Sequence, residues 1–411
     1  MSKRIIFLFT FFVFWLIFFP TAKVILDTTY NGWLQNFMIL IMAFYFRKHI
    51  MQLFKGHYRW INFSVLSYCV ICVVSLLIND STISNYTTMK VRDGVISVIE
   101  GNHSTKSTIY FSLSLLSLLV LVERLSLENK VEYFLKYLWN FSLLLWIWVN
   151  IDAFTHVVID EKIGGYVIGN KFHVCYYNLF VCVIYYLNHP NLTTKKEKMS
   201  LLFLIVVLLF ACLHTQCSTM VVGTMAFASL VFLVPEKMWH RLSSASFIVS
   251  LLVVVDLVFF FFTTWVLQYP IVQDFIVDVL HEDLTLTGRL GIFENITESF
   301  SKGMWLGFGN GNSRVVSLFY TGVENPQNGL IEVFLNVGVV GCVVFLQWLY
   351  LSLKEIKETD YYKYPIVLYI LTMIVVSTIE VPFGGTFMFF MILLLAERRK
   401  VEVKKVIDYG A

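Results

Sequence analysis

Apolar runs of roughly 15 to 23 residues recur along the whole chain and are separated by polar segments. Runs of this length suit helices that cross the ~30 Å hydrocarbon core of a bilayer. The pattern predicts an all-α, polytopic membrane protein with about twelve transmembrane helices in a single membrane domain, residues 1–411. The predicted spans are 5–20, 33–46, 60–78, 108–122, 133–151, 174–188, 200–214, 219–234, 245–267, 329–352, 365–379 and 386–396.

The distribution of Lys and Arg supports this count independently. If the N-terminus is cytoplasmic, every predicted inside segment holds at least two of the 31 Lys and Arg residues. The predicted outside segments hold nine: Lys23, Lys90, Arg92, Lys106, Lys162, Lys171, Arg289, Lys302 and Arg314. Because cytoplasmic loops of membrane proteins are enriched in Lys and Arg, the alternation predicts that both termini are cytoplasmic. A multi-pass protein of a bacterial cell membrane is expected.

Composition narrows the class of partner. Hydrophobic residues make up 58% of the chain, charged residues only 14%, and the mean hydropathy is +0.72. Soluble proteins carry about 25% charged residues. A net charge of +3 is too small to indicate nucleic-acid binding, so membrane lipids are the expected surroundings. The seven cysteines lie in or beside predicted spans and form neither a disulfide framework nor a metal-ligand spacing.

One predicted outside segment, 268–328, is much longer than the turns of most membrane bundles. It is polar and Gly-rich, and apolar positions at Phe293, Ile296 and Phe300 have helical spacing, which predicts a short amphipathic helix on the membrane surface. A large extracytoplasmic loop of this kind indicates recognition or chemistry at the membrane face. Two further outside segments, 79–107 and 152–173, are also long.

Cations in the outside segments are candidates for anion binding. Arg289 follows Gly288, so the backbone can approach a ligand while the guanidinium forks onto phosphate oxygens. The alternative for Arg289 and Arg314 is a solvated loop arginine that pairs with a nearby carboxylate. Lys171 and His173, just before the sixth predicted span, are candidates for a second anion site, and a structural role is the alternative for the histidine.

Glycines and amides form the second group of candidates. The amides of Gly307, Gly309 and Gly311 could cradle an anion or a sugar, although an ordinary turn also accounts for them. Gln327 and Asn328 follow Pro326 at the start of the tenth predicted span, where they could bind sugar hydroxyls or cap the helix.

An ionisable residue and the absence of known motifs complete the list of candidates. Glu332 lies one turn into the tenth predicted span, and ionisable residues at membrane depth usually face a cavity or a partner. The sequence has no HExxH, no GxSxG and no P-loop, so chemistry without a metal or cofactor is expected.

Together these segments resemble the O-antigen ligase/polymerase superfamily, which includes Wzy-type polysaccharide polymerases. The resemblance lies in Thr-Gly-Arg at 287–289, in Gly-Phe-Gly-Asn-Gly at 307–311, and in Gln-Asn-x-Leu-Ile-Glu followed by Gly-x-x-Gly at 327–341. Weaker echoes are Gly-Asn-Lys at 169–171 and Cys-Ser-Thr at 217–219. The family has a histidine where this chain has Gln327, and an amide cannot accept a proton at neutral pH. His173, Glu324 and Glu332 are the alternative bases, and the departure favours a polymerase over a ligase.

The resemblance implies a GT-C-like bundle and a metal-independent glycosyltransferase. Such an enzyme transfers a glycan from a polyprenyl diphosphate carrier to the terminal sugar of another lipid-linked repeat, as in capsule, exopolysaccharide or O-antigen biosynthesis. The implied catalytic residues are Arg289, Gln327 and Glu332. The implied substrate-binding residues are Lys171, His173, Gly288, Gly307, Gly309, Gly311, Arg314 and Asn328. A partner that regulates chain length is also expected. A ligase acting on another acceptor, a lipid-linked oligosaccharide flippase and a secondary transporter remain alternatives.

Overall fold

The described part of the fold is helical apart from one short hairpin. A computed structural model describes residues 1–18, 28–50, 53–54, 58–92, 95–155, 165–190, 192–266, 269–274, 289–356 and 363–396. The helices of the first half are α1 (Lys3–Phe18), α2 (Thr28–Ile50), α3 (Arg59–Ile83), the 3-10 helix η1 (Ser84–Tyr86), α4 (Thr105–Leu127), α5 (Val131–Thr155), α6 (Lys171–Asn188) and α7 (Lys195–His214). Those of the second half are α8 (Ser218–Leu233), α9 (Glu236–Leu242), α10 (Ala245–Val266), α11 (Pro270–Asp274), α12 (Arg289–Gly303), α13 (Ser313–Thr321), α14 (Gly329–Lys354), α15 (Tyr364–Ser377) and α16 (Gly385–Leu393).

Several of these helices can cross a membrane. Five in the described part are long and apolar enough to do so, and they correspond to α3 with η1, α4, α5, α7 and α14. Shorter apolar helices accompany them at Ser218–Leu233, Ala245–Phe261 and Tyr364–Ser377. The chain is therefore a membrane-embedded helical protein.

Local sequence sets several helix ends. Asn170 and Thr194 each accept a bond from the backbone three residues on, and the side chains of His173 and Glu197 reach back to complete two capping boxes. These bonds satisfy amide groups that a helix start otherwise leaves without partners. Gly322 ends α13 in the left-handed conformation, with φ of 74°, which glycine adopts without steric cost.

The centre of the bundle is aromatic. Helix α6 is buried along most of its length, and it packs between α5, α7 and α15. The Phe180 ring lies 4.6 Å from the ring of Phe18 and 5.4 Å from that of Phe390, and Tyr369 lies 4.5 Å from Phe390, all between ring centroids. Rings at these separations add stabilisation beyond the area they bury. Helices α1, α6, α15 and α16 therefore share one continuous core.

A second, smaller core lies apart from this one. It joins the ends of α3, α10 and α14 to η1, α12 and α13. Its buried residues are Ile83, Tyr86, Phe260, Ile292, Phe293, Ile296, Phe308, Val315, Val316, Ile331 and Leu335. The predicted long loop is thus a folded cap in its described part, and the helix expected around Phe293 and Ile296 is α12.

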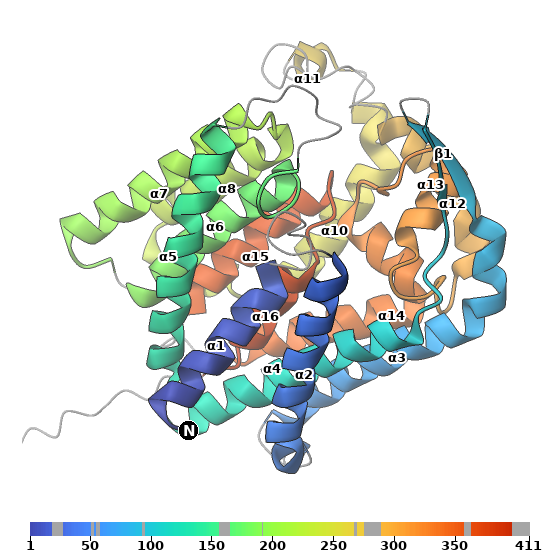
Figure 1. Cartoon of the computed structure of the whole chain (residues 1–411). Helices are drawn as coiled ribbons and strands as arrows, with labels where there is room; N and C mark the ends of the chain where they lie inside the picture. The colour runs from blue at the N-terminus through green and yellow to red at the C-terminus, as the bar shows by residue number, and fades with distance from the viewer. Residues whose placement is uncertain are drawn as a thin grey trace, which may run out of the picture.

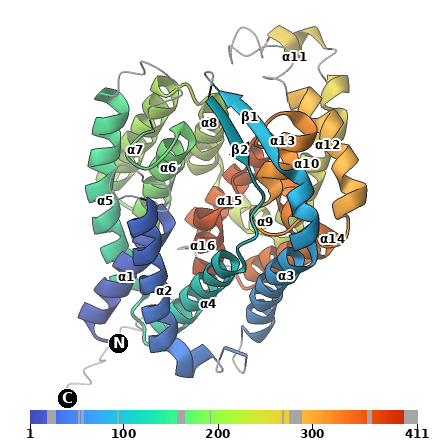
Figure 2. The same ribbon diagram turned by 45° about the vertical axis from the view of Figure 1, so that its right-hand side comes forward.

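The cap occupies one side of the bundle. In both ribbon views α12 and α13 lie beside α10, while α5 and α7 lie on the far side (Figures 1 and 2). A hairpin of β1 (Thr88–Arg92) and β2 (Val95–Ile99) runs alongside α13, with Thr88 opposite Ile99 and Arg92 opposite Val95. This hairpin departs from the purely helical prediction, because the span pattern carried no information about the outside segment 79–107.

Candidate functional site

The glycine-rich segment of the cap pairs with the backbone of α14. The Phe308 amide donates to the Leu335 carbonyl at 2.7 Å, and the Gly309 amide donates to the Asn336 carbonyl at 3.1 Å. One turn further along α14, the amides of Val339 and Val340 donate to the carbonyls of Met304 and Trp305 at 2.9 and 3.1 Å. The cap segment 304–309 and α14 therefore share backbone bonds on both sides of residue 338.

Helix α14 is broken where the cap segment meets it. Gly338 has φ of 65° and ψ of −169°, which is outside the helical region. A Cβ on Gly338 would lie 2.4 Å from the Trp305 carbonyl carbon and oxygen, and one on Gly307, with φ of 68°, would lie 2.5 Å from the Val337 nitrogen. Only glycine permits so close an approach of two backbones. The bonds from the cap segment satisfy amide groups that the break removes from the helix.

The amides of the three cap glycines donate to oxygens of the protein. The Gly307 amide bonds the Gly303 carbonyl at 2.9 Å, the Gly309 amide bonds Asn336, and the Gly311 amide bonds the Asn336 Oδ1 at 3.0 Å. An anion cradle needs amides that point to a ligand. The arrangement thus favours the structural turn over the anion cradle at these positions.

Asparagines join the cap to the stretch before α4. Asn312 is fully buried, and its Oδ1 accepts the Asn102 amide at 2.5 Å. The Asn102 Nδ2 donates to the Asn310 carbonyl at 2.9 Å, and the Asn336 Oδ1 also accepts the Ser313 amide at 3.1 Å. From α3, the Asn79 Nδ2 donates to the Gly307 carbonyl at 3.0 Å. These bonds fix the cap against both α3 and α14.

The N-terminus of α14 is capped by two protein side chains. Asn328 is buried, and its Oδ1 accepts the Ile331 amide at 3.0 Å. The Asp256 carboxylate, from the middle of α10, accepts the Leu330 amide at 3.3 Å and the Ser377 hydroxyl at 2.8 Å. A carboxylate at a helix N-terminus is favoured by the helix dipole. Capping by Asn328, one of its two predicted roles, is thus present, and two of the amides at this helix start bond protein oxygens.

Two more carboxylates accompany Asp256 here. Glu332 is half-buried in the first turn of α14, and its Oε1 accepts the Ser313 hydroxyl at 3.4 Å. Glu380 follows α15 and is 4% exposed; it accepts bonds from the Asn325 side chain and from the Val381 amide. Glu380 also interacts electrostatically with Glu332. Three elements distant in sequence therefore bring carboxylates to the start of α14.

Gln327 and the first turns of α6 border this acidic cluster. Gln327 is half-buried and has φ of 57°, and its backbone N–H donates to the Asn325 Oδ1 at 2.8 Å. On α6, Tyr176 interacts electrostatically with Glu380. Lys171 and His173 lie one turn before Tyr176, so the structure brings the start of α6 and the start of α14 to the same end of the bundle.

The predicted cations have various partners. Arg314 is 62% exposed and pairs with Glu324 at 2.5 Å, and the Lys171 Nζ donates to the Gln216 carbonyl at 3.1 Å. His173 bonds Asn170 in the capping box. Arg289 begins α12, but its side chain lies outside the described part, as does Gly288.

Sequence reasoning missed Asp256 and Glu380. Both are ionisable residues beside or within apolar runs, the pattern that drew attention to Glu332. Asp256 interrupts the run from Ala245 to Val266, so the same criterion applied to every span would have found it. Glu380 lies at a predicted span end, where a carboxylate is common. Among the described residues, no group of three or more His, Cys, Asp and Glu side chains could hold a metal ion.

No protein-family model, no curated protein and no solved structure matches the chain.

Proposed function

We propose that this protein is a polysaccharide polymerase of the Wzy type in a bacterial cell membrane, with about twelve spans in a GT-C-like bundle and both termini in the cytoplasm. It joins lipid-linked oligosaccharide repeats at the outer face without a metal. The observation that carries the proposal is the convergence of Glu332, Glu380 and Asp256 with the amide side chains of Asn325 and Asn328 at the start of α14. Carboxylates and amides are groups that bind sugar hydroxyls.

The proposed reaction moves one glycan between two carriers. A hydroxyl of the terminal sugar of the acceptor attacks the anomeric carbon of the donor, and the bond from that carbon to the diphosphate breaks. The diphosphate leaves with the electron pair, and the hydroxyl proton passes to Glu332. The donor is already activated by its diphosphate, so neither ATP nor a nucleotide sugar is required.

Glu332 suits the role of base better than Gln327. Gln327 occupies the position of the family's histidine, but an amide is not basic. Glu332 is half-buried, and the Ser313 hydroxyl at 3.4 Å is the only hydrogen-bond partner of its side chain among the described residues. A positioned base contributes about 10²- to 10⁴-fold to the rate. Arg289, Lys171 and Arg314 are the proposed cations for the departing diphosphate, and loss of one such donor costs roughly 10²- to 10³-fold.

A direct assay tests the proposal. The purified protein is incubated in vesicles with a lipid-linked repeat unit, and the products are separated by size. We expect a ladder from the wild type, loss of the ladder from Glu332→Gln and Arg289→Ala, and a normal ladder from Glu298→Gln, which removes an exposed carboxylate of α12. A wild-type ladder unchanged in both Glu332→Gln and Arg289→Ala would refute the assigned roles.

A flippase for the same lipid-linked substrate is the second candidate. The observation that favours it is the burial of Asp256 and Glu380, which are 1% and 4% exposed inside the helical part of the molecule. Buried charges in membrane bundles often mark a transport path. Movement of a fluorescent lipid-linked repeat across the vesicle membrane, without a ladder, would establish the flippase. Attachment of the glycan to a different acceptor would instead establish the ligase.

A further inference from the structure

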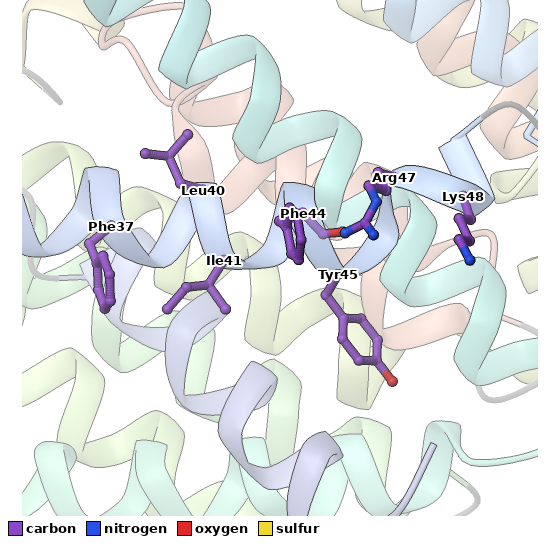
Figure 3. A pocket seen from close by; sticks show the side chains of 7 residues that line it. All are labelled: Phe37, Leu40, Ile41, Phe44, Tyr45, Arg47 and Lys48. Carbon is purple, nitrogen blue, oxygen red and sulfur yellow. The ribbon is translucent and has the colours of Figure 1, made fainter.

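The outward face of α2 carries an apolar groove with a cationic end. Phe37, Leu40, Ile41, Phe44 and Tyr45 line it, and Arg47 and Lys48 close it at the C-terminal end of the helix (Figure 3). The groove has a volume of about 550 Å³ and is open on one side. Its lining residues recur at intervals of three and four, so they share one face of the helix.

Phe37, Leu40 and Phe44 on this face are exposed in the described part of the chain, whereas Ile41 packs against the core and the Tyr45 ring lies 5.0 Å from that of Phe9 in α1. Phe37 is 61% and Phe44 68% exposed, whereas Met42 and Phe46, on the opposite face, are buried against the bundle. Helix α2 packs on α4 and, less closely, on α1. Exposed aromatic and aliphatic side chains on a membrane helix are covered by lipid tails. The groove is therefore an apolar surface on which such a tail can lie.

Among the described residues, the cations at its end have no carboxylate partner. The Arg47 guanidinium lies 3.8 Å from the centroid of the Phe44 ring and donates to the Phe44 carbonyl at 3.1 Å. Within the part of the chain that the structure describes, no carboxylate pairs with Arg47 or Lys48, both of which are exposed. By contrast, Arg124 and Lys130 both pair with Glu128, at 2.8 and 2.7 Å.

Aromatic residues place this end of the groove at a membrane interface. At the start of α3, Arg59 lies over the ring of Trp60 at 5.4 Å, and Trp60 is 62% exposed. Exposed Trp and Tyr side chains with flanking Lys and Arg are typical of the headgroup level of a bilayer. Arg47 and Lys48 of α2 thus lie where phosphate headgroups are found.

We propose that the α2 groove is a binding site for an anionic phospholipid, with an acyl tail along Phe37 to Tyr45 and the phosphate on Arg47 and Lys48. Arg forms forked, charge-assisted bonds to phosphate oxygens, and basic clusters beside membrane helices select anionic headgroups. Charge complementarity at the end of an open apolar groove is the basis of the assignment. The alternative is that Arg47 and Lys48 only interact favourably with the α2 dipole. That alternative requires no groove and predicts no preference for anionic lipids.

Native mass spectrometry of the full-length protein tests this site. Purified protein is titrated with phosphatidylglycerol or with phosphatidylcholine of the same acyl chains, and bound lipids are counted. The wild type should retain phosphatidylglycerol preferentially. The double variant Arg47→Gln/Lys48→Gln should bind phosphatidylglycerol about tenfold more weakly. The control, Lys195→Gln/Lys196→Gln at the start of α7, removes the same charge from exposed positions and should retain the wild-type affinity.

Other outcomes would overturn the proposal. Equal retention of both lipids by the wild type would mean ordinary lipid contact only, and an equal loss in the α7 control would mean a general charge effect. A dimer that forms in place of lipid binding would assign the groove to a second copy. Should the double variant fold poorly, raising the salt concentration must weaken phosphatidylglycerol binding to the wild type and leave phosphatidylcholine binding unchanged.

Discussion

Asp256 is a carboxylate buried in the middle of an apolar helix. A carboxylate in the middle of an apolar helix is costly to bury unless its oxygens are hydrogen-bonded. Here one oxygen accepts the Ser377 hydroxyl and the other accepts the Leu330 amide, so Asp256 joins α10, α14 and α15. Its side chain therefore determines where α14 begins relative to the rest of the bundle.

Replacement of Asp256 by alanine should destabilise the protein by about 1–3 kcal/mol for each buried group left without a partner. We expect Asp256→Asn to cost less, because an amide oxygen can still accept one bond. Ser377→Ala serves as the matched control, since it removes a single hydroxyl from the same contact. Thermal unfolding in detergent measures all three; a melting temperature of Asp256→Ala equal to that of the wild type would contradict the linking role.

At the scale of elements, the break in α14 is the feature that organises the candidate site. The positive φ of Gly338 and its contact with Trp305 occur where the carbonyls of Met304 and Trp305 accept backbone bonds from α14. The break orients the first turns of α14, which carry Asn328 and Glu332, against the cap.

Gly338→Ala should be one of the most disruptive small substitutions in the protein. The backbone of Gly338, with φ of 65° and ψ of −169°, lies in a region that essentially only glycine occupies and that costs another residue about 1–3 kcal/mol. The new Cβ would also meet the Trp305 backbone at 2.4 Å. Gly322→Ala is the control, because Gly322 also has a positive φ, 74°, but open space around it, so it tests the cost of a positive φ without a contact. Melting temperatures compare the two. An equal loss in both variants would mean that the cap segment does not press on α14.

The link between α4 and α5 should respond to pH. Burial would raise the pKa of Glu128, but hydrogen bonds from Lys130 and from the amino group of Met1 lower it to about 2. Because the folded pKa lies below the unfolded value of about 4.3, this contribution to stability is complete above pH ~4.3 and disappears as the pH falls towards 2. The difference in melting temperature between wild type and Glu128→Gln should therefore narrow below pH ~4.3. A constant difference from pH 7 to pH 3 would exclude this linkage.

Helix positions were largely predictable, because apolar runs are long and continuous. The predicted spans 60–78 and 329–352 correspond to α3, Arg59–Ile83, and α14, Gly329–Lys354. The prediction could not reveal that α14 is broken at Gly338, because the break depends on a contact with Trp305, more than thirty residues earlier in the chain.

Candidate residues were predictable by type but not by partner. Glu332 and Asn328 stood out as polar residues at the start of an apolar helix, and the structure places both at the acidic cluster. Asp256 and Glu380 join them through the packing of α10 and α15 on α14, and such long-range contacts leave no trace in local spacing.

At the scale of the whole molecule, the proposed topology can be tested chemically. It puts α12 outside and the start of α7 inside the cell. The seven native cysteines are buried, apart from the half-buried Cys342, so their background labelling should be low. We expect a membrane-impermeant maleimide to label Glu298→Cys but not Lys196→Cys in intact cells, with both labelled after permeabilisation. Labelling of Lys196→Cys before permeabilisation would reverse the proposed orientation.

The interlocking of the cap with α14 has a consequence for biogenesis. The segment 304–309 is synthesised before Gly338. Its backbone amides and carbonyls must therefore hydrogen-bond to water until α14 enters the bilayer. Helix α14 cannot bend at Gly338 until the segment 304–309 docks on it, since a bent backbone in hydrocarbon would have amides and carbonyls without hydrogen-bond partners. Docking and bending should therefore occur as a single event late in assembly. A chain cut at the exposed turn of Gly322 should then still assemble, because the bonds between the segment 304–309 and α14 join the two fragments.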